Sequence, residues 1–317
     1  MKNMMNKKDR LASGMSGRWG RSKRALLALT AAVLLAVSMS GCSRGGSSDT
    51  IQVATKGFAE SDILANALKL LIEQETDLKA NVKSLDNNLL WNALKIKEVD
   101  TYVEYTGTAL INILKAEPEY DPQKVYDKVK KELKEKNQIT VLDPLGFTNS
   151  YAFGVHKDKA ENLGLKTGSD VAANSEELVF GASEEFMNRP DLWPPVLESY
   201  EPKFKDIKTI AGGLYYQAID QGLIDVAMVQ TTSAQVLVRP IVVLEDDKHV
   251  YVPYYAIPVV RDEVLKKHPE LEKILNSMAG KITDSEMQKL NGEVENNQRS
   301  ALEVAKEWLI ANDLLKG

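Results

Sequence analysis

The stretch VDTYVEYTGTAL, from Val99 to Leu110, decides how the rest of the chain is interpreted. Its first half, Tyr102 to Tyr105, favours a β-strand, and an apolar segment that permits a helix follows Gly107. A strand that stops at a glycine and passes into a helix presents its last side chains at the carboxyl edge of a sheet, where α/β proteins bind ligands. We therefore expect Tyr105 at the rim of a site, with the Thr108 hydroxyl beside a helix N-terminus. The alternative is a buried tyrosine next to an ordinary helix cap.

Residues 1–41 are expected to be a signal peptide and not part of the fold. Eight lysines and arginines precede an apolar run of thirteen residues, Ala25 to Val37, which is too short to span a bilayer comfortably and suits a signal-peptide core. Cys42 is the chain's single cysteine and comes directly after small residues, so it resembles the lipidated cysteine of a bacterial lipobox. Residues 42–49 would then be a flexible tether. The alternative is an ordinary secretory signal with a chance cysteine.

Removal of this leader makes the remaining chain strongly acidic. The full sequence of 317 residues has 40 basic and 45 acidic residues, and without residues 1–41 the counts are 32 and 44, a net charge of −12. No basic patch of the kind that binds nucleic acid is left, and the charge suits a domain held near an anionic membrane without adhering to it. The 276 residues that remain are enough for two lobes of typical size.

Strand-like and helix-like segments alternate in two successive β-rich series, and the first series predicts a lobe with a mainly parallel sheet. Everything after Arg261 is expected to be helical, and capping-box patterns at Thr283–Glu286 and Ser300–Glu303 each predict a helix start. The expected strands are Ile51–Ala54, Asn81–Leu85, Tyr102–Tyr105, Ile139–Leu142, Tyr151–His156, Leu178–Ala182, Ile207–Ala211, Asp225–Val229, Ile241–Leu244 and Tyr251–Val260.

The sequence offers no constellation for catalysis or for a transition metal. The three histidines, at positions 156, 249 and 268, are not spaced as metal ligands. A nucleophile elbow, a phosphate-binding loop and a dinucleotide fingerprint are all missing from the sequence. We therefore expect no enzymatic activity, no cofactor and no metal.

Tyrosine is the residue type that stands out. All eleven tyrosines lie after the leader, and Tyr105, Tyr151 and Tyr254 fall at the ends of expected strands. Rings around a cavity attract a methylated ammonium, and each contributes about 0.5–2 kcal/mol. Three rings give roughly 2–6 kcal/mol, whereas micromolar binding needs about 8 kcal/mol. Such a cage would need a second anchor for an anionic tail and closure of the lobes; the alternative is that the tyrosines pack in the core.

A series of motifs spans roughly residues 51–315. They are KGFAESDIL (Lys56–Leu64), YVEYTGT (Tyr102–Thr108), TNSYAFGV (Thr148–Val155), GASEEF (Gly181–Phe186), YYQAIDQGLIDVAMVQTTSAQV (Tyr215–Val236) and DDKHVYVPYYAIPVV (Asp246–Val260), followed by MQKLNGEV and VAKEWL. In this order and at this spacing they resemble the substrate-binding lipoproteins of osmoprotectant ABC importers, the quaternary-amine uptake family for glycine betaine, carnitine and choline.

The resemblance implies a two-lobed α/β fold of the type II periplasmic-binding-protein class, with the ligand in the interlobe cleft. Lobe 1 would comprise residues 50–147 and 241–317, and lobe 2 residues 148–240. It also implies an extracytoplasmic solute-binding protein that delivers a small quaternary ammonium compound to an ABC permease with its ATPase. The protein would be lipid-anchored through Cys42 to the outer face of the bacterial cell membrane.

The resemblance places the family's cage tyrosines on Tyr105, Tyr151 and Tyr254. Thr108 matches a position where choline-selective members carry aspartate. Threonine there favours a zwitterion, because a carboxylate would repel the ligand's own carboxylate. Thr232 is expected to help hold such a carboxylate tail.

Two positions depart from the family pattern. Gln230 stands where many members have a tyrosine, so an amide replaces a fourth wall of the cage, and Ser61 stands where many members have glutamine. Both changes make the pocket more polar or roomier. Another trimethylammonium or amine ligand such as ergothioneine, or a ligand sensor on the same fold, therefore stays open beside glycine betaine, carnitine and choline.

Overall fold

The computed structural model describes residues 50–211 and 213–316. The expected signal peptide, Cys42 and the tether lie outside the described residues. Within the described ranges, no helix combines the length and the apolar character needed to cross a membrane.

The first five-stranded sheet combines four strands from the start of the described chain with one late strand. Its order is β2-β1-β3-β10-β4. Strand β1 (Thr50–Thr55) pairs in parallel with both β2 (Lys79–Ser84) and β3 (Thr101–Tyr105). Strand β10 (Ala256–Arg261) runs antiparallel between β3 and β4 (Ile139–Val141). The sheet is therefore parallel except for the strand that returns from later in the chain.

The second five-stranded sheet repeats this pattern with the order β7-β6-β8-β5-β9. Strand β6 (Val179–Ala182) pairs in parallel with β7 (Asp206–Thr209) and β8 (Val226–Gln230). Strand β5 (Tyr151–His156) runs antiparallel to both β8 and β9 (Ile241–Val243). The single antiparallel strand is again the one that enters from the other sheet.

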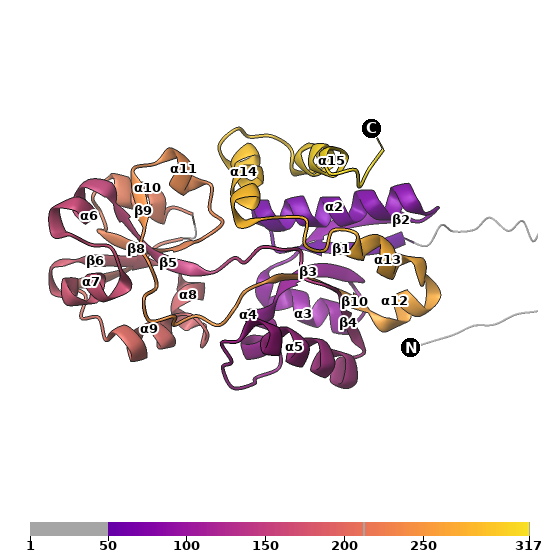
Figure 1. The fold of residues 1–317 in the computed structure, drawn as a ribbon, viewed down its shortest axis with the longest axis horizontal. Helices are drawn as coiled ribbons and strands as arrows, with labels where there is room; N and C mark the ends of the chain where they lie inside the picture. The colour runs from indigo at the N-terminus through magenta and orange to yellow at the C-terminus, as the bar shows by residue number, and fades with distance from the viewer. Residues whose placement is uncertain (1–49, 212, 317) are drawn as a thin grey trace, which may run out of the picture. The chain divides into compact units, whose positions relative to one another are not determined.

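Strand β9 corrects one expected boundary. We expected lobe 2 to end at residue 240, but Ile241–Val243 pairs with β5 and so still belongs to the second sheet. The chain returns to the first sheet only after Val243, along a segment that was expected to become a strand at Tyr251 and does so at Ala256. This segment lies beside the outgoing connection, because residues 148 and 255 form an antiparallel bridge (Figure 1).

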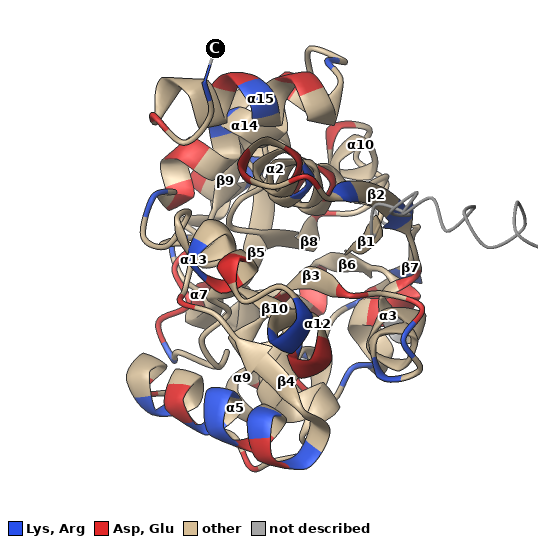
Figure 2. Cartoon of the chain, turned by 90° about the vertical axis from the view of Figure 1, so that its right-hand side faces the viewer, with Lys and Arg blue, Asp and Glu red and all other residues tan. Residues whose placement is uncertain are grey.

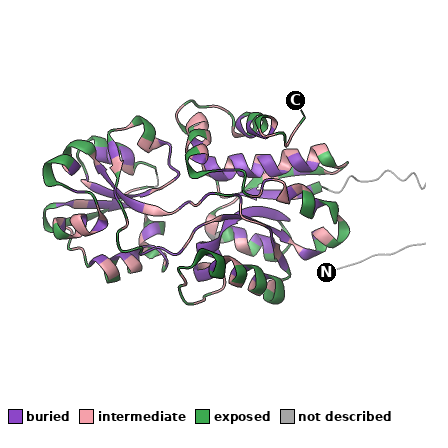
Figure 3. Cartoon of the chain, viewed as in Figure 1, coloured by how far each residue is buried: buried purple, intermediate pink, exposed green. Residues whose placement is uncertain are grey.

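Helices surround both sheets (Figure 1). Figure 3 shows that the strands are largely buried and that exposed residues gather on the outward helix faces. Helix α5 carries lysines and acids on its solvent side (Figure 2). The helical segments are α2 (Ala59–Glu75), α3 (Asn87–Lys95), α4 (Thr106–Thr108), the π-helix η1 (Ala109–Ile113), α5 (Pro122–Asn137), α6 (Lys157–Leu163), α7 (Gly168–Ala173), η2 (Ser175–Glu177), α8 (Glu184–Asn188), α9 (Trp193–Tyr200), α10 (Tyr215–Asp220), α11 (Gln235–Val238), α12 (Asp262–Lys267), α13 (Glu270–Asn276), α14 (Asp284–Glu295) and α15 (Ala301–Ala311).

Both helix starts that were expected from capping-box patterns are confirmed, but neither box forms in full. The Thr283 hydroxyl accepts a hydrogen bond from the Glu286 backbone N–H at 3.2 Å, so this N-cap is confirmed at the start of α14. Ser300 directly precedes α15, but its side chain forms no capping hydrogen bond. The second helix start is therefore confirmed, whereas its capping box is wrong.

The core of the second sheet is built around a stack of aromatic rings. The ring of Phe180 lies 4.9 Å from that of Trp193 and 4.8 Å from that of Phe204, with all three nearly parallel. Phe180 is on β6, and Trp193 begins α9. Because aromatic rings bury large apolar areas in fixed geometry, this stack holds α9 against the strand that leads into the loop at Ser183.

Candidate ligand-binding site

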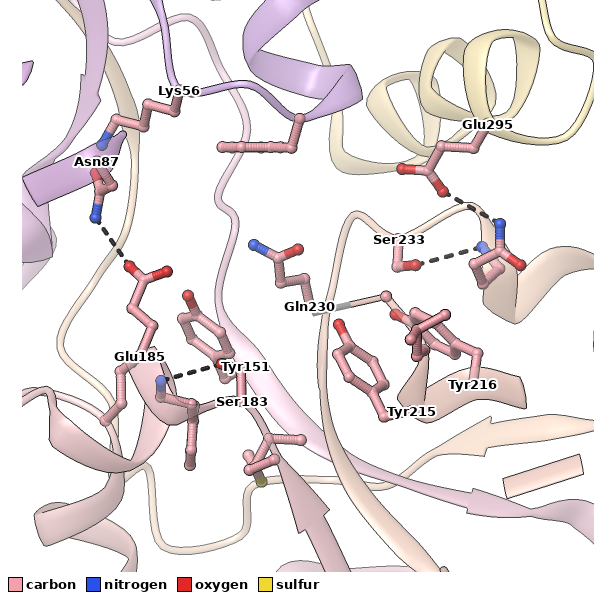
Figure 4. A pocket seen from close by; sticks show the side chains of 18 of the residues that line it. Lys56, Asn87, Tyr151, Ser183, Glu185, Tyr215, Tyr216, Gln230, Ser233 and Glu295 are labelled. Carbon is pink, nitrogen blue, oxygen red and sulfur yellow. Dashed lines mark hydrogen bonds between the residues drawn. The ribbon is translucent and has the colours of Figure 1, made fainter. Parts of the chain in front are cut away.

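A cavity of about 700 Å³ is lined by residues from both sheets and their helices (Figure 4). A cavity of this volume is typical of pockets for small organic ligands. The residues that line it include Lys56, Phe58, Asn87, Tyr105, Tyr151, Glu185, Phe186, Arg189, Tyr215, Tyr216, Gln230, Ser233, Arg239 and Glu295.

The β3–α4 junction brings Tyr105 to this cavity, but not in the expected way. Strand β3 ends at Tyr105 and the helix begins at the next residue, so Gly107 lies inside the helix and does not end the strand. A Cβ atom on Gly107 would lie 2.7 Å from the Tyr254 ring and 2.8 Å from the Val252 side chain. The glycine is therefore needed for close packing of this helix against the returning segment.

The side chain of Tyr105 is held from two directions. Its hydroxyl donates a hydrogen bond to Glu60. On its ring, the Lys56 ammonium lies 5.2 Å from the centroid, and this ammonium also forms an ion pair with Glu104. The ring thus already interacts with a cation supplied by the protein.

Glu60, on the first turn of α2, links several segments behind Tyr105. It is only 1% exposed, and it also accepts hydrogen bonds from Asn149 at 2.8 Å and from Asn291 at 3.2 Å. Burial raises the pKa of Glu60 above its ordinary value, against the lowering effect of its hydrogen-bond donors. Asn149 lies on the segment between the two sheets, and Asn291 lies on α14. The Glu60 carboxyl group therefore links α2, this segment and α14 to Tyr105 at the cavity wall.

Tyr151, the first residue of β5, forms an aromatic cluster at the cavity. Its ring centroid lies 5.7 Å from that of Phe186, 5.8 Å from that of Tyr251 and 5.9 Å from that of Tyr254. Tyr254 is 1% exposed and donates a hydrogen bond to Asp191 at 2.6 Å. Tyr151 therefore faces the cavity, and Tyr254 supports it from behind.

The remaining expected site residues divide into one that lines the cavity and three that lie behind its lining. Gln230 lines it, at the end of β8 (Figure 4). Thr108 accepts a hydrogen bond from Arg189 at 3.2 Å. Ser61 accepts one from the Lys56 backbone N–H at 2.8 Å. Thr232 is 2% exposed and its carbonyl accepts a hydrogen bond from a side-chain amide of α14. Their roles toward a ligand, like those of the tyrosines, stay predictions.

The basic residues that line the cavity are all neutralised by carboxylates of the protein. Lys56 pairs with Glu104, Arg189 with Asp191 and Arg239 with Asp220. Glu295, which also lines the cavity, forms no ion pair within the described residues and accepts only a 3.4 Å hydrogen bond from the Gln235 amide. Partial burial raises the pKa of Glu295. Aromatic faces and an unpaired carboxylate together favour a cationic ligand over an anionic one.

A comparison with protein families identifies the fold and its general role. Residues 49–311 match the substrate-binding domain of the ABC-type glycine betaine transport system. The chain belongs to this family. Members are transport proteins that bind a substrate and are not enzymes.

Curated relatives and solved structures agree with this assignment. The carnitine transport binding protein OpuCC of Listeria monocytogenes serotype 1/2a (strain 10403S) is 36% identical over 305 residues, which cover 93% of this chain and 99% of that protein. The ergothioneine transport permease/ergothioneine binding protein EgtU of Helicobacter pylori (strain G27) is 34% identical over 262 residues, 81% of this chain and 46% of that protein. A crystal structure of a glycine betaine/carnitine/choline ABC transporter matches with a TM-score of 0.73 at 33% identity, over 83% of this chain and 99% of that one. The expected two-lobed, periplasmic-binding-protein-like α/β fold is confirmed.

Several residues at the site of this glycine-betaine-type binding domain were not anticipated from the sequence. Arg189 makes a two-point contact with Asp191, with nitrogen–oxygen distances of 2.6 and 3.0 Å. Burial alone would raise the pKa of Asp191, but the hydrogen bond and charge of Arg189 lower it below its ordinary value. Glu60 could have been recognised from the sequence as an acidic residue on an apolar helix face, because it lies one helical turn before Ile63 and Leu64 on α2.

Proposed function

We propose that this protein captures a quaternary ammonium solute of the glycine betaine, carnitine or choline type and delivers it to an ABC importer. The observation that carries the proposal is the make-up of the cavity. Rings of Tyr105, Tyr151, Tyr215 and Phe186 line it, and each basic lining residue already has a carboxylate partner. A methylated ammonium cannot donate hydrogen bonds, so ring faces are its best partners in a desolvated site.

The polar lining residues supply the second anchor that a cation cage alone lacks. Arg189 keeps a 14% exposed side chain, and its Nη1 lies 3.5 Å from Glu185, a longer contact than the one it makes with Asp191. If a ligand carboxylate took the place of Glu185 beside Nη1, the ion pair between Arg189 and Asp191 would stay intact. In this arrangement Thr108 and Thr232 support the tail from behind the lining, Thr108 through the guanidinium whose hydrogen bond it accepts. Tyr105, Tyr151 and Tyr254 hold or support the head.

Binding of small trimethylammonium compounds to the purified protein tests this function. We expect glycine betaine, carnitine or choline to bind with micromolar or tighter affinity by titration calorimetry. Glycine is the matched control, because it keeps the carboxylate of glycine betaine but lacks the methyl groups, and it should not bind measurably. Ergothioneine, a further trimethylammonium compound, belongs in the panel. If no compound with a trimethylammonium group binds, the proposed function is wrong.

The family places the protein outside the cytoplasm, as a substrate-binding protein of an ABC importer. We propose that Cys42 carries the lipid that holds it at the outer face of the cell membrane, beside its permease and ATPase. The change Cys42→Ser removes the thiol that would be lipidated. We expect the variant either to be released into the medium or to keep residues 1–41, as measured by cell fractionation and by intact mass.

The control for this anchoring experiment is Ser43→Ala, next to the cysteine, which should fractionate as the unchanged protein does. A Cys42→Ser protein with the same membrane fraction and the same processed mass as the unchanged protein would contradict lipidation at Cys42. That result would leave the ligand-binding proposal untouched, since none of the cavity residues is involved.

A further inference from the structure

One end of the cavity contains a buried hydroxyl group without a well-placed hydrogen-bond partner. Tyr216, on α10, lines the cavity and is 3% exposed. Within the described ranges of the chain its hydroxyl makes no hydrogen bond of good geometry, although the Ser233 and Tyr215 side chains lie close enough to act on its pKa. Burial raises the pKa of Tyr216 to about 12, so the hydroxyl stays protonated at neutral pH. Buried polar groups in proteins are nearly always hydrogen-bonded. A hydroxyl at a cavity wall whose neighbours are poorly placed for a hydrogen bond therefore indicates a group that a ligand can satisfy.

Three other lining residues lie at the same end. The ring of Tyr215 is 4.5 Å from that of Tyr216, and Ser233 accepts a hydrogen bond from the Gln235 backbone N–H at 3.3 Å. Glu295 completes the group. In Figure 4, Tyr215, Tyr216, Ser233 and Glu295 lie on one side of Gln230, whereas Lys56, Asn87 and Glu185 lie on the other.

The charge of this end favours a hydrogen-bond donor on the ligand. Glu295 is the last residue of α14, where the helix dipole is negative and does not offset the carboxylate. The basic side chain nearby, Arg239, forms an ion pair with Asp220 and donates to Gln235. A ligand carboxylate would meet another carboxylate here, but a hydroxyl or N–H group would find acceptors.

We propose that Tyr215, Tyr216, Ser233 and Glu295 form a donor subsite, which binds a hydroxyl or N–H group on the ligand. This inference rests on the proposed function and narrows it. The preferred solute is an extended quaternary amine that carries a hydrogen-bond donor, and not glycine betaine, which has none. Gln230, where the family resemblance implies a tyrosine in many members, lies beside this end of the cavity, and the ring of Tyr215 supplies an aromatic surface there.

The test uses carnitine and γ-butyrobetaine, which differ only by the carnitine hydroxyl. Titration calorimetry compares the unchanged protein with Tyr216→Phe and Glu295→Gln. We expect the unchanged protein to bind carnitine about tenfold more tightly than γ-butyrobetaine, because a site built to bond a hydroxyl rejects the analogue that lacks it. Each variant should reduce this preference to about threefold or less. The ratio of the two affinities is the readout, because loss of the Glu295 charge weakens the binding of both ligands alike.

The controls are Tyr120→Phe and Glu303→Gln, at exposed positions outside the cavity lining, and they should keep the full preference. Thermal unfolding checks that Tyr216→Phe is folded, which is expected because the hydroxyl that it removes makes no hydrogen bond of good geometry. Equal binding of the two ligands by the unchanged protein, tighter binding of glycine betaine than of carnitine, or an unaltered preference in both variants overturns the donor subsite but not the proposed function. If no quaternary amine binds the unchanged protein, both are overturned.

Discussion

Replacement of Glu60 by alanine is expected to lower the free energy of unfolding by about 3–5 kcal/mol. The Glu60 carboxyl group accepts hydrogen bonds from Tyr105, Asn149 and Asn291, and all four residues are buried. Removing the acceptor leaves buried donors unpaired, and each such group costs about 1–3 kcal/mol. Asn291 loses least, since it also donates to the Thr232 carbonyl. Urea unfolding followed by circular dichroism measures the change.

A matched control lies on the same helix. Glu75→Ala removes an exposed carboxylate at the end of α2 and should change the free energy of unfolding by no more than about 0.5 kcal/mol. A similarly small change in the Glu60→Ala protein would show that the three donors find other partners and that the carboxyl group does not organise this region.

The stability contribution of Glu60 should also depend on pH in a defined direction. Burial raises its folded-state pKa above the ordinary value of 4.5. The folded protein therefore holds this proton more tightly than the unfolded chain, so the contribution is fully present below about pH 4.5 and is lost as the pH rises through the folded-state pKa. Relative to a Glu60→Gln variant, the unchanged protein should lose stability between pH 4.5 and neutrality. Parallel curves for the two proteins would contradict the raised pKa.

The strand ends at the cavity were predictable because local sequence determines them. Tyr105 stands at the carboxyl end of a short β-prone run, and the rule that ligands bind at that edge of a sheet is enough to predict a site there. Tyr151 begins its strand, so it was assigned to the site through the family resemblance and not through this rule. The structure puts both at the cavity lining. The alternation of strands and helices likewise predicted two sheets, since each series contains its own buried strands.

Features that depend on contacts between distant segments were not predictable. The Tyr254 ring decides that position 107 must be glycine, although the two residues are far apart in sequence. The partners of Arg189 and Glu60 come from other elements, and no spacing rule links them. The end of the second sheet was misplaced because a short apolar run such as Ile241–Val243 fits either sheet equally well until its pairing partner is known.

Replacement of Tyr151 by leucine is expected to weaken binding of a trimethylammonium ligand about tenfold, and the double change Tyr105→Leu with Tyr151→Leu about 100-fold. Leucine fills much of the space of the ring but lacks its quadrupole, so the loss reports the cation–π contribution. Both rings line the cavity. The Tyr105 ring also contacts the Lys56 ammonium, so we expect the Tyr151 change to account for at least half of the combined effect. Titration calorimetry with the tightest ligand of the panel provides the affinities.

Phenylalanine variants separate the ring from the hydroxyl. Tyr151→Phe keeps the ring face, so its affinity for the ligand should lie within about threefold of that of the unchanged protein. Tyr254→Phe removes the 2.6 Å hydrogen bond to the fully buried Asp191 side chain and should lower the free energy of unfolding by about 1–3 kcal/mol. Tyr120→Leu, at a residue 52% exposed and outside the cavity lining, controls for loss of a tyrosine as such. If the double leucine variant is folded and binds as the unchanged protein does, the cation is held elsewhere and the assignment of the cage to these tyrosines fails.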